Sequence, residues 1–224
     1  MKKSAVKKLV VLISGSGSNL QAIIEACAAG GALHDKYEIV LVLSNRATAF
    51  GLQRAAALGI PTQTFSLKSF QEKVHVIDQD KKLSPARIEF DLAVANAIHA
   101  TGADIVMLAG WMHIWSEAGL KAAGLNTISA KNVPILNLHP ALPNQFAGLH
   151  AIERGYTAYR AGKVNELGCM VHEVIAEVDA GQVVDTQIVT VAAGDTLDDF
   201  AANMHAAEHT LIVRALALAH AQYF

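Results

Sequence analysis

The sequence is poor in cysteine, has no long hydrophobic run and shows no excess of basic residues. Its two cysteines, Cys27 and Cys169, are far apart and form no Cys-x-x-Cys pair, which disfavours a disulfide framework or a cysteine zinc site. No stretch reaches the roughly 18 consecutive apolar residues that a membrane-spanning helix needs. The net charge is −2, from 18 Lys and Arg against 20 Asp and Glu. We therefore expect neither a membrane nor a nucleic acid as a partner.

The N-terminal segment has the charge of a signal peptide but not its hydrophobic length. Lys7 and Lys8 come directly before the apolar run Leu9–Ile13, and a Ser/Gly loop follows that run at once. A signal peptide needs a longer apolar stretch and a cleavage site with small residues. We interpret the run as a buried strand and expect a cytoplasmic protein.

Apolar runs alternate with helical patterns along the chain, and hydrophobic residues make up 52% of its 224 residues. This order predicts an α/β fold with a Rossmann-like open, mostly parallel twisted sheet flanked by helices. We expect a single domain over 1–224, with a seam near Pro134 between approximate halves 1–133 and 134–224. The predicted strands of the first half and seam are 9–13, 39–43, 62–65, 105–108 and 135–138, and the predicted helices are 20–29, 50–58 and 88–101.

The rest of the chain carries mixed patterns. Lys68–Glu89 is polar and predicts a loop that leads into a helix, and Pro140–Gly148 predicts a loop. A helix is expected at 151–161. The segments 170–175 and 183–191 alternate like strands of a partly exposed sheet, with a turn at 179–181 between them. The last helix is expected to begin near Thr196, where Thr196 and Asp199 stand at the spacing of a capping box.

A glycine-rich loop, Ser14-Gly-Ser-Gly-Ser-Asn19, lies between the first predicted strand and the first helix. Glycines allow a tight turn, and the helix N-terminus offers unpaired N–H groups, so the loop suits a phosphate. A dinucleotide loop would need a third glycine where Leu20 stands, and an acidic residue after the second strand, where the chain has Ser44-Asn-Arg46. A structural turn remains the alternative.

Asn137 and His139 stand two residues apart at the end of a predicted strand, so their side chains share one face. An amide can stabilise a developing oxyanion, and an imidazole can donate or shuttle a proton. Asp179, at a turn, is the candidate carboxylate that would raise the pKa of the imidazole and orient it. The alternative is a core histidine and an ordinary turn residue, because spacing does not show that Asp179 meets His139.

The pattern His-x-x-Glu-His at 205–209 matches a zinc-protease motif. We expect no metal there, because such a site needs a further acidic ligand and 210–224 contains no Asp or Glu. His205 and Glu208 share a helix face, so they could bind a polar substrate instead.

Taken together, these motifs resemble the phosphoribosylglycinamide formyltransferases, the folate-dependent enzymes of purine synthesis. The resemblance runs from about Leu9 to Ala217. It is carried by the segments 11–24 (VLISGSGSNLQAII), 43–52 (LSNRATAFGL), 108–112 (LAGWM), 136–143 (LNLHPALP), 148–150 (GLH), 171–172 (VH) and 178–181 (VDAG). Many members have arginine at the position of His113 and glutamine at that of His205.

The resemblance implies a role for each matched position. The catalytic residues would be Asn137, His139 and Asp179, with Asp179 raising the pKa of His139. Glycinamide ribonucleotide would contact Gly17, Ser18 and Asn19 through its phosphate, and Gly110, Met112, His205 and Glu208 elsewhere. The co-substrate 10-formyltetrahydrofolate would contact Arg87, Met112, His113, Ile114, Trp115, Asn137, Val174, Ile175, Ala176 and Glu177.

The implied reaction is direct formyl transfer to the amine of the ribonucleotide, by a monomer or homodimer and without a metal. The nearest alternative is a 10-formyltetrahydrofolate hydrolase, which shares the catalytic residues. Such hydrolases usually carry an N-terminal regulatory domain, and only eight residues precede the predicted strand at Leu9. Methionyl-tRNA formyltransferase would be expected to have an extra C-terminal domain. From other classes, a nicotinamide dehydrogenase or a non-catalytic nucleotide-binding module remain alternatives.

Overall fold

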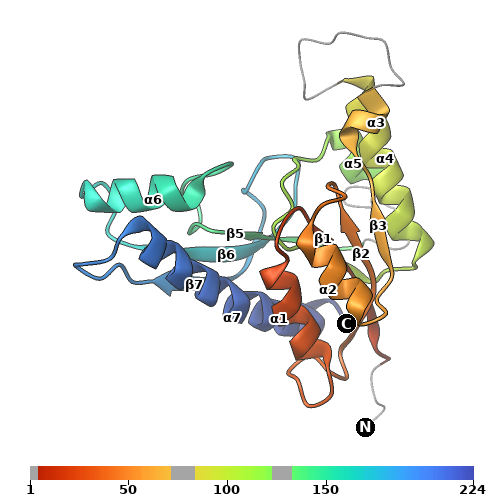
Figure 1. The fold of residues 1–224 in the computed structure, drawn as a ribbon, viewed down its shortest axis with the longest axis horizontal. Helices are drawn as coiled ribbons and strands as arrows, with labels where there is room; N and C mark the ends of the chain where they lie inside the picture. The colour runs from red at the N-terminus through yellow and green to blue at the C-terminus, as the bar shows by residue number, and fades with distance from the viewer. Residues whose placement is uncertain (1–4, 72–83, 123–132) are drawn as a thin grey trace. The chain divides into compact units, whose positions relative to one another are not determined.

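A computed structural model describes residues 5–71, 84–122 and 133–224 (Figure 1). They contain a seven-stranded sheet with the order β3-β2-β1-β4-β5-β6-β7. Strands β1 to β3 and the β1–β4 pair are parallel, whereas β6 is antiparallel to both β5 and β7. The α/β prediction of a mostly parallel sheet is thus confirmed. The strands are β1 (Lys7–Ile13), β2 (Tyr37–Ser44), β3 (Thr62–Thr64), β4 (Ile105–Leu108), β5 (Ile135–His139), β6 (Leu167–Glu173) and β7 (Val183–Val189).

The chain divides into two compact units. Unit 1 comprises Met1–Gln21 and Asp35–Ile135, and unit 2 comprises Ala22–His34 and Leu136–Phe224. Of the described helices, none is both long and apolar enough to cross a membrane. The helices are α1 (Ser18–Cys27), α2 (Phe50–Ala57), α3 (Leu67–Gln71), α4 (Pro85–Ala100), α5 (Glu117–Ala122), α6 (Ala151–Arg160) and α7 (Leu197–Tyr223).

In unit 1, β1 is flanked by β2 and β4, so its residues Leu9–Ile13 are fully buried, as a continuous apolar run requires in a parallel sheet. Helix α2 packs against β2, and α4 packs against α3 and α5. Helix α4 begins at Pro85 behind the N-cap Ser84, whose side chain accepts from the Arg87 N–H. The predicted loop at Lys68–Glu89 therefore holds α3 and the first turn of α4, while its part at 72–83 lies outside the described residues.

In unit 2, β6 lies between β5 and β7, and α7 packs against β6 and β7. Six of the seven residues of β6 are buried. The expectation of a partly exposed strand there was wrong, because β6 pairs with a strand on each edge and packs against both α6 and α7. The same expectation is correct for β7, whose first six residues are all exposed or half-buried. The capping box at Thr196 and Asp199 is confirmed, with both of its hydrogen bonds present.

Candidate active site

The glycine loop of unit 1 is held from behind by α2. Gly17 has a φ of 71°, and a Cβ on it would lie 2.5 Å from the Gly51 Cα atom. At this close approach the Gly51 N–H donates to the Gly15 carbonyl (3.2 Å). One turn further along α2, Arg54 Nε donates to the Ser16 carbonyl (3.0 Å). Two glycines in mutual contact therefore let a helix fix two successive carbonyls of the loop.

This anchoring leaves the other side of the loop to its N–H groups. The C=O and N–H of a trans peptide point in opposite directions, so fixing the Ser16 carbonyl also fixes the direction of the Gly17 N–H. Helix α1 begins at Ser18, directly after Gly17, and Asn19 is buried in its first turn. N–H groups at a helix start attract anions. The loop is thus built in a way that suits a phosphate, as the sequence predicts.

A second segment of unit 1, 110–116, follows strand β4. Gly110 has a φ of 79°, and the Met112 N–H donates to the buried Ser14 hydroxyl (2.7 Å). The Met112 and Ile114 side chains are 61% and 45% exposed, whereas Trp115 is buried. The segment therefore presents two large apolar side chains to solvent from a backbone that is hydrogen-bonded to the end of β1.

Arg87, predicted to meet the folate, lies against this same segment. Its guanidinium Nη2 donates to the Ile114 carbonyl. Burial lowers the pKa of Arg87, although the nearby Asp91 carboxylate acts in the opposite direction. His113 Nε2 lies 2.5 Å from Asp91 Oδ1. Arg87 and Asp91 thus both contact the segment that contains His113. The sequence analysis did not single out Asp91.

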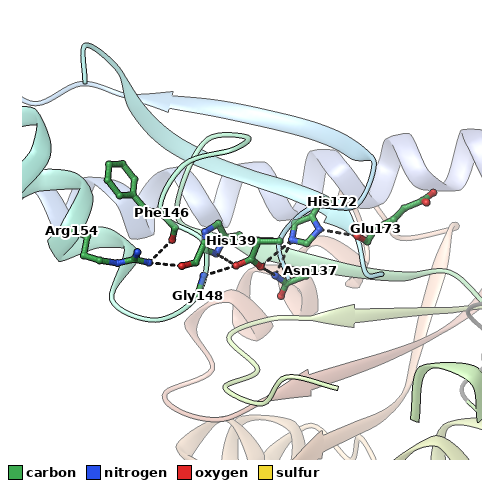
Figure 2. Close-up of polar contacts among 9 residues, drawn as sticks. Asn137, His139, Phe146, Gly148, Arg154, His172 and Glu173 are labelled. Carbon is green, nitrogen blue, oxygen red and sulfur yellow. Dashed lines mark hydrogen bonds and ion pairs between the residues drawn. The ribbon is translucent and has the colours of Figure 1, made fainter. Parts of the chain in front are cut away.

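In unit 2, Asn137, His139 and Asp179 come together. Figure 2 shows the polar contacts around Asn137 and His139. Asn137 Nδ2 donates to Asp179 Oδ1 (3.4 Å). His139 Nδ1 lies 3.5 Å from Asp179 Oδ2, and the two side chains are only 6% and 10% exposed. His139 Nε2 is buried and has no hydrogen-bond partner within the described chain. Nε2 is thus the ring nitrogen without a partner among the described residues, while the carboxylate faces Nδ1.

His172 on β6 also belongs to this network, although sequence analysis gave it no role. The β5–β6 register pairs it directly with Asn137. Asn137 Nδ2 lies 3.1 Å from His172 Nε2, and His172 Nδ1 lies 2.8 Å from the Glu173 carbonyl oxygen. His172 Nε2 also lies 3.5 Å from Asp179 Oδ1, so the ring stands beside both the amide and the carboxylate. The motif Val171-His172 was the available signal, because antiparallel pairing places it opposite Asn137.

The pKa of His139 departs from the expectation. Burial lowers it below the ordinary 6.5, Asp179 acts to raise it, and His172 lowers it further. The carboxylate therefore acts in the predicted direction, but the prediction of a raised pKa was wrong because desolvation of the imidazolium outweighs it. For Asp179, burial acts to raise the pKa, but contacts with His172 and the Gly148 N–H outweigh it and lower the pKa.

The loop after β5 is tied to the same carboxylate. The Gly148 N–H donates to Asp179 Oδ2 (2.8 Å), and Arg154 Nη2 donates to the carbonyls of Phe146 (2.5 Å) and Ala147 (2.7 Å). Figure 2 shows Arg154 reaching this loop from α6. Asp179 itself has a φ of 56°, a conformation that Asp and Asn adopt more readily than most residues. Asp179 therefore connects two loops as well as two side chains.

The remaining predicted residues of unit 2 fall into two groups. His205 Nδ1 lies 2.9 Å from Glu208 Oε2 on α7, with His205 exposed and Glu208 buried. Glu208 raises the pKa of His205. The segment 174–177 leaves β6 toward the turn at Asp179, and Ile175 on it is 40% exposed.

Over 5–71, 84–122 and 133–224, no cluster of three His, Cys, Asp or Glu could hold a metal ion.

Comparisons with known proteins agree on one family. The family model "Formyl transferase" matches residues 7–216. Phosphoribosylglycinamide formyltransferase of Schizosaccharomyces pombe is 43% identical over 94% of this chain and 96% of its own length. The protein of that name from Escherichia coli is 36% identical over 91% of this chain and 82% of its own length. The crystal structure of glycinamide ribonucleotide transformylase 1 from Symbiobacterium toebii superimposes with a TM-score of 0.78 and 33% identity, covering 98% of this chain and 90% of that one.

Proposed function

The chain belongs to the formyl transferase family, and from that premise we propose that it transfers a formyl group from 10-formyltetrahydrofolate to the amine of glycinamide ribonucleotide, in purine biosynthesis. The observation that carries this proposal is the convergence of Asn137, His139 and Asp179 in unit 2. An amide, an imidazole with a buried unpaired nitrogen, and a carboxylate form the set that acyl transfer to an amine needs.

The reaction proceeds by direct attack. The amine nitrogen of the ribonucleotide attacks the formyl carbon, and the carbonyl becomes a tetrahedral oxyanion. The Asn137 amide donates a hydrogen bond to that oxyanion, and His139 Nε2 does so once it has taken a proton from the attacking amine. Collapse breaks the bond from carbon to N10 of the folate, which takes up a proton while the attacking amine loses one. His139 relays this proton, and no metal or covalent enzyme intermediate takes part.

The environment of His139 suits this cycle. Its lowered pKa leaves the imidazole neutral in the free enzyme near pH 7, so it can accept the proton that the attacking amine releases. Asp179, 3.5 Å from Nδ1, then stabilises the imidazolium ion that forms. Asn137 Nδ2 lies 3.1 Å from His172 Nε2 and donates to Asp179 Oδ1 at 3.4 Å. The longer contact, to Asp179, is the one that Asn137 gives up to reach the oxyanion.

Each substrate is assigned the residues that the family resemblance implies. In unit 1, Gly17, Ser18 and Asn19 hold the phosphate of the ribonucleotide, and Gly110 and Met112 contact its remainder. In unit 2, His205 and Glu208 bind its polar groups. The folate contacts Arg87 and the segment 112–115 of unit 1, and Asn137 and the segment 174–177 of unit 2. The exposed apolar side chains of Met112, Ile114 and Ile175 support this assignment, because the flat faces of the folate rings pack against apolar side chains.

An absorbance assay tests the proposal. Purified protein is mixed with 10-formyltetrahydrofolate, with and without glycinamide ribonucleotide. Loss of the formyl group only in the presence of the ribonucleotide is the expected result. Loss without it would identify a hydrolase, and no reaction under either condition would contradict the proposal.

Two variants make the assay specific to the site. His139→Gln should lower kcat by roughly two to four orders of magnitude, the usual contribution of a general acid or base. The matched control is His99→Gln, at an exposed position of α4, which should react like the unmodified protein. We further propose that the protein acts in the cytoplasm as a monomer or homodimer and uses no metal. Light scattering and activity after chelation test the last two points.

A further inference from the structure

Helix α4 carries a buried carboxylate that faces the segment 111–116. Asp91 is fully buried, and its Oδ1 lies 2.5 Å from His113 Nε2. Its Oδ2 accepts from the Ser116 N–H (2.6 Å). A Cβ on Gly119 of α5 would lie 2.4 Å from the Asp91 Cβ atom, so the carboxylate is closed in from that side too. Both oxygens of Asp91 are thus committed to one short stretch of chain.

These two contacts determine which way the side chains of that stretch face. His113 is buried with its ring 4.6 Å from that of Phe90, and Trp115 is 7% exposed. The alternating residues Met112 and Ile114 are instead 61% and 45% exposed. Holding His113 inward therefore holds two large apolar side chains outward.

Arg87 adds a third contact from the same face of α4. It stands four residues before Asp91, one helical turn away, and its guanidinium donates to the Ile114 carbonyl. A carbonyl, an N–H and a ring nitrogen of residues 113–116 are therefore all bound by two side chains of one helix. This arrangement fixes the segment in position and in orientation.

Stability alone is a poor explanation for Asp91. Removing a carboxylate from water costs several kcal/mol, and well-packed apolar side chains of similar size often stabilise as well or better. What the buried pair supplies is a defined geometry, because its hydrogen bonds have fixed partners and directions. The segment that it defines is the one that presents Met112 and Ile114.

We propose that Asp91 is a positioning residue of the folate site: it binds the His113 ring and the Ser116 N–H and so holds Met112 and Ile114 in place for the flat faces of the folate rings. The proposal rests on the proposed function, which assigns 112–115 to the folate. It gives the His113 side chain a structural partner inside unit 1.

The test compares loss and rescue at both partners. Asp91→Leu and His113→Leu remove the pairing, whereas Asp91→Asn and His113→Gln keep groups that can hydrogen-bond. Val94→Ala creates a cavity on the same buried face of α4. It is the control for a loss of stability that leaves the Asp91–His113 pair in place. Binding of 10-formyl-5,8-dideazafolate and of glycinamide ribonucleotide is measured separately by calorimetry, and folding is followed by thermal unfolding.

We expect both leucine variants to bind the folate analogue roughly tenfold more weakly, and the ribonucleotide within about twofold of the unmodified protein. Asp91→Asn and His113→Gln should recover most of the folate affinity, and Val94→Ala should leave both affinities unchanged. Folded leucine variants with unchanged folate affinity, or with equal loss for both ligands, would overturn the proposal. If Asp91→Leu does not fold, the His113 pair decides. If the unmodified protein binds no folate analogue, the proposed function itself fails.

Discussion

Replacing Asp179 with asparagine removes a charge from the centre of the candidate active site with almost no change in shape. Asparagine tolerates the φ of 56° found at this position, and one oxygen remains to accept from the Gly148 N–H. The carboxylate that faces His139 Nδ1 at 3.5 Å is lost. Asp179→Asn therefore removes the charge while it keeps the shape of the side chain and the contact with Gly148.

The size of the effect follows from the pair. An opposite charge within about 4–6 Å changes a pKa by about 1–3, and each pKa unit corresponds to about 1.4 kcal/mol. The side chains are 6% and 10% exposed, so solvent screens them little. Since the imidazolium ion of His139 forms during the reaction, losing Asp179 should lower kcat by roughly 10- to 1000-fold.

The assay is steady-state formyl transfer as a function of pH, with thermal unfolding to verify folding. Without the carboxylate the pKa of His139 falls further. As the pH is lowered, the decline of kcat should therefore begin at a lower pH than in the unmodified protein. Asp198→Asn, which removes an exposed carboxylate from the first turn of α7, is the control and should leave the profile unchanged. A folded Asp179→Asn variant with kcat within about threefold of the unmodified protein across the profile would refute the assigned role.

Three further changes test other parts of the structure. Gly17→Ala should destabilise unit 1 by about 1–2 kcal/mol because of the left-handed φ at this position, and by more because the new Cβ would meet Gly51. Urea unfolding measures the loss, and an unchanged midpoint would contradict the close approach of the two glycines. His139→Gln should reduce the loss of stability on acidification. In the unmodified protein the pKa of His139 is lower in the folded state than the unfolded value of 6.5, so the unfolded state binds the proton first. The stability of that protein therefore falls as the pH drops below 6.5. Equal pH dependence in both proteins would argue against a lowered pKa. Glu208→Gln should lower the pKa of His205, because the contact with Glu208 raises it, and an unchanged NMR titration of His205 would contradict the pair.

Local patterns predicted the elements of the sheet well, and the failures have physical causes. The short helix α5 was not predicted, because six residues that include Gly119 give too little periodicity to recognise. Helix α4 begins at Pro85, earlier than its apolar pattern indicates, because a serine N-cap followed by proline starts a helix without apolar residues. The burial of β6 depends on neighbours that its own sequence does not reveal.

The candidate site divides in the same way. Strand alternation predicted that Asn137 and His139 share a face, and both do contact Asp179. That Asp179 reaches them depends on a left-handed turn after β6, which spacing could not show. His172 enters through the register of two antiparallel strands, and Asp91 through the packing of a helix against a loop distant in sequence.

By itself, the sequence determined the alternation of strands and helices, the glycine loop before α1 and the family to which the chain belongs, because these depend on residue order and local geometry. The tertiary structure alone decided the surroundings of the charged groups. Burial reversed the expected direction of the His139 pKa, since desolvation depends on every atom packed around the imidazole. It also turned Asp91 from one acidic residue of a helix into the partner of His113 and Ser116, because only packing brings those groups within hydrogen-bonding distance.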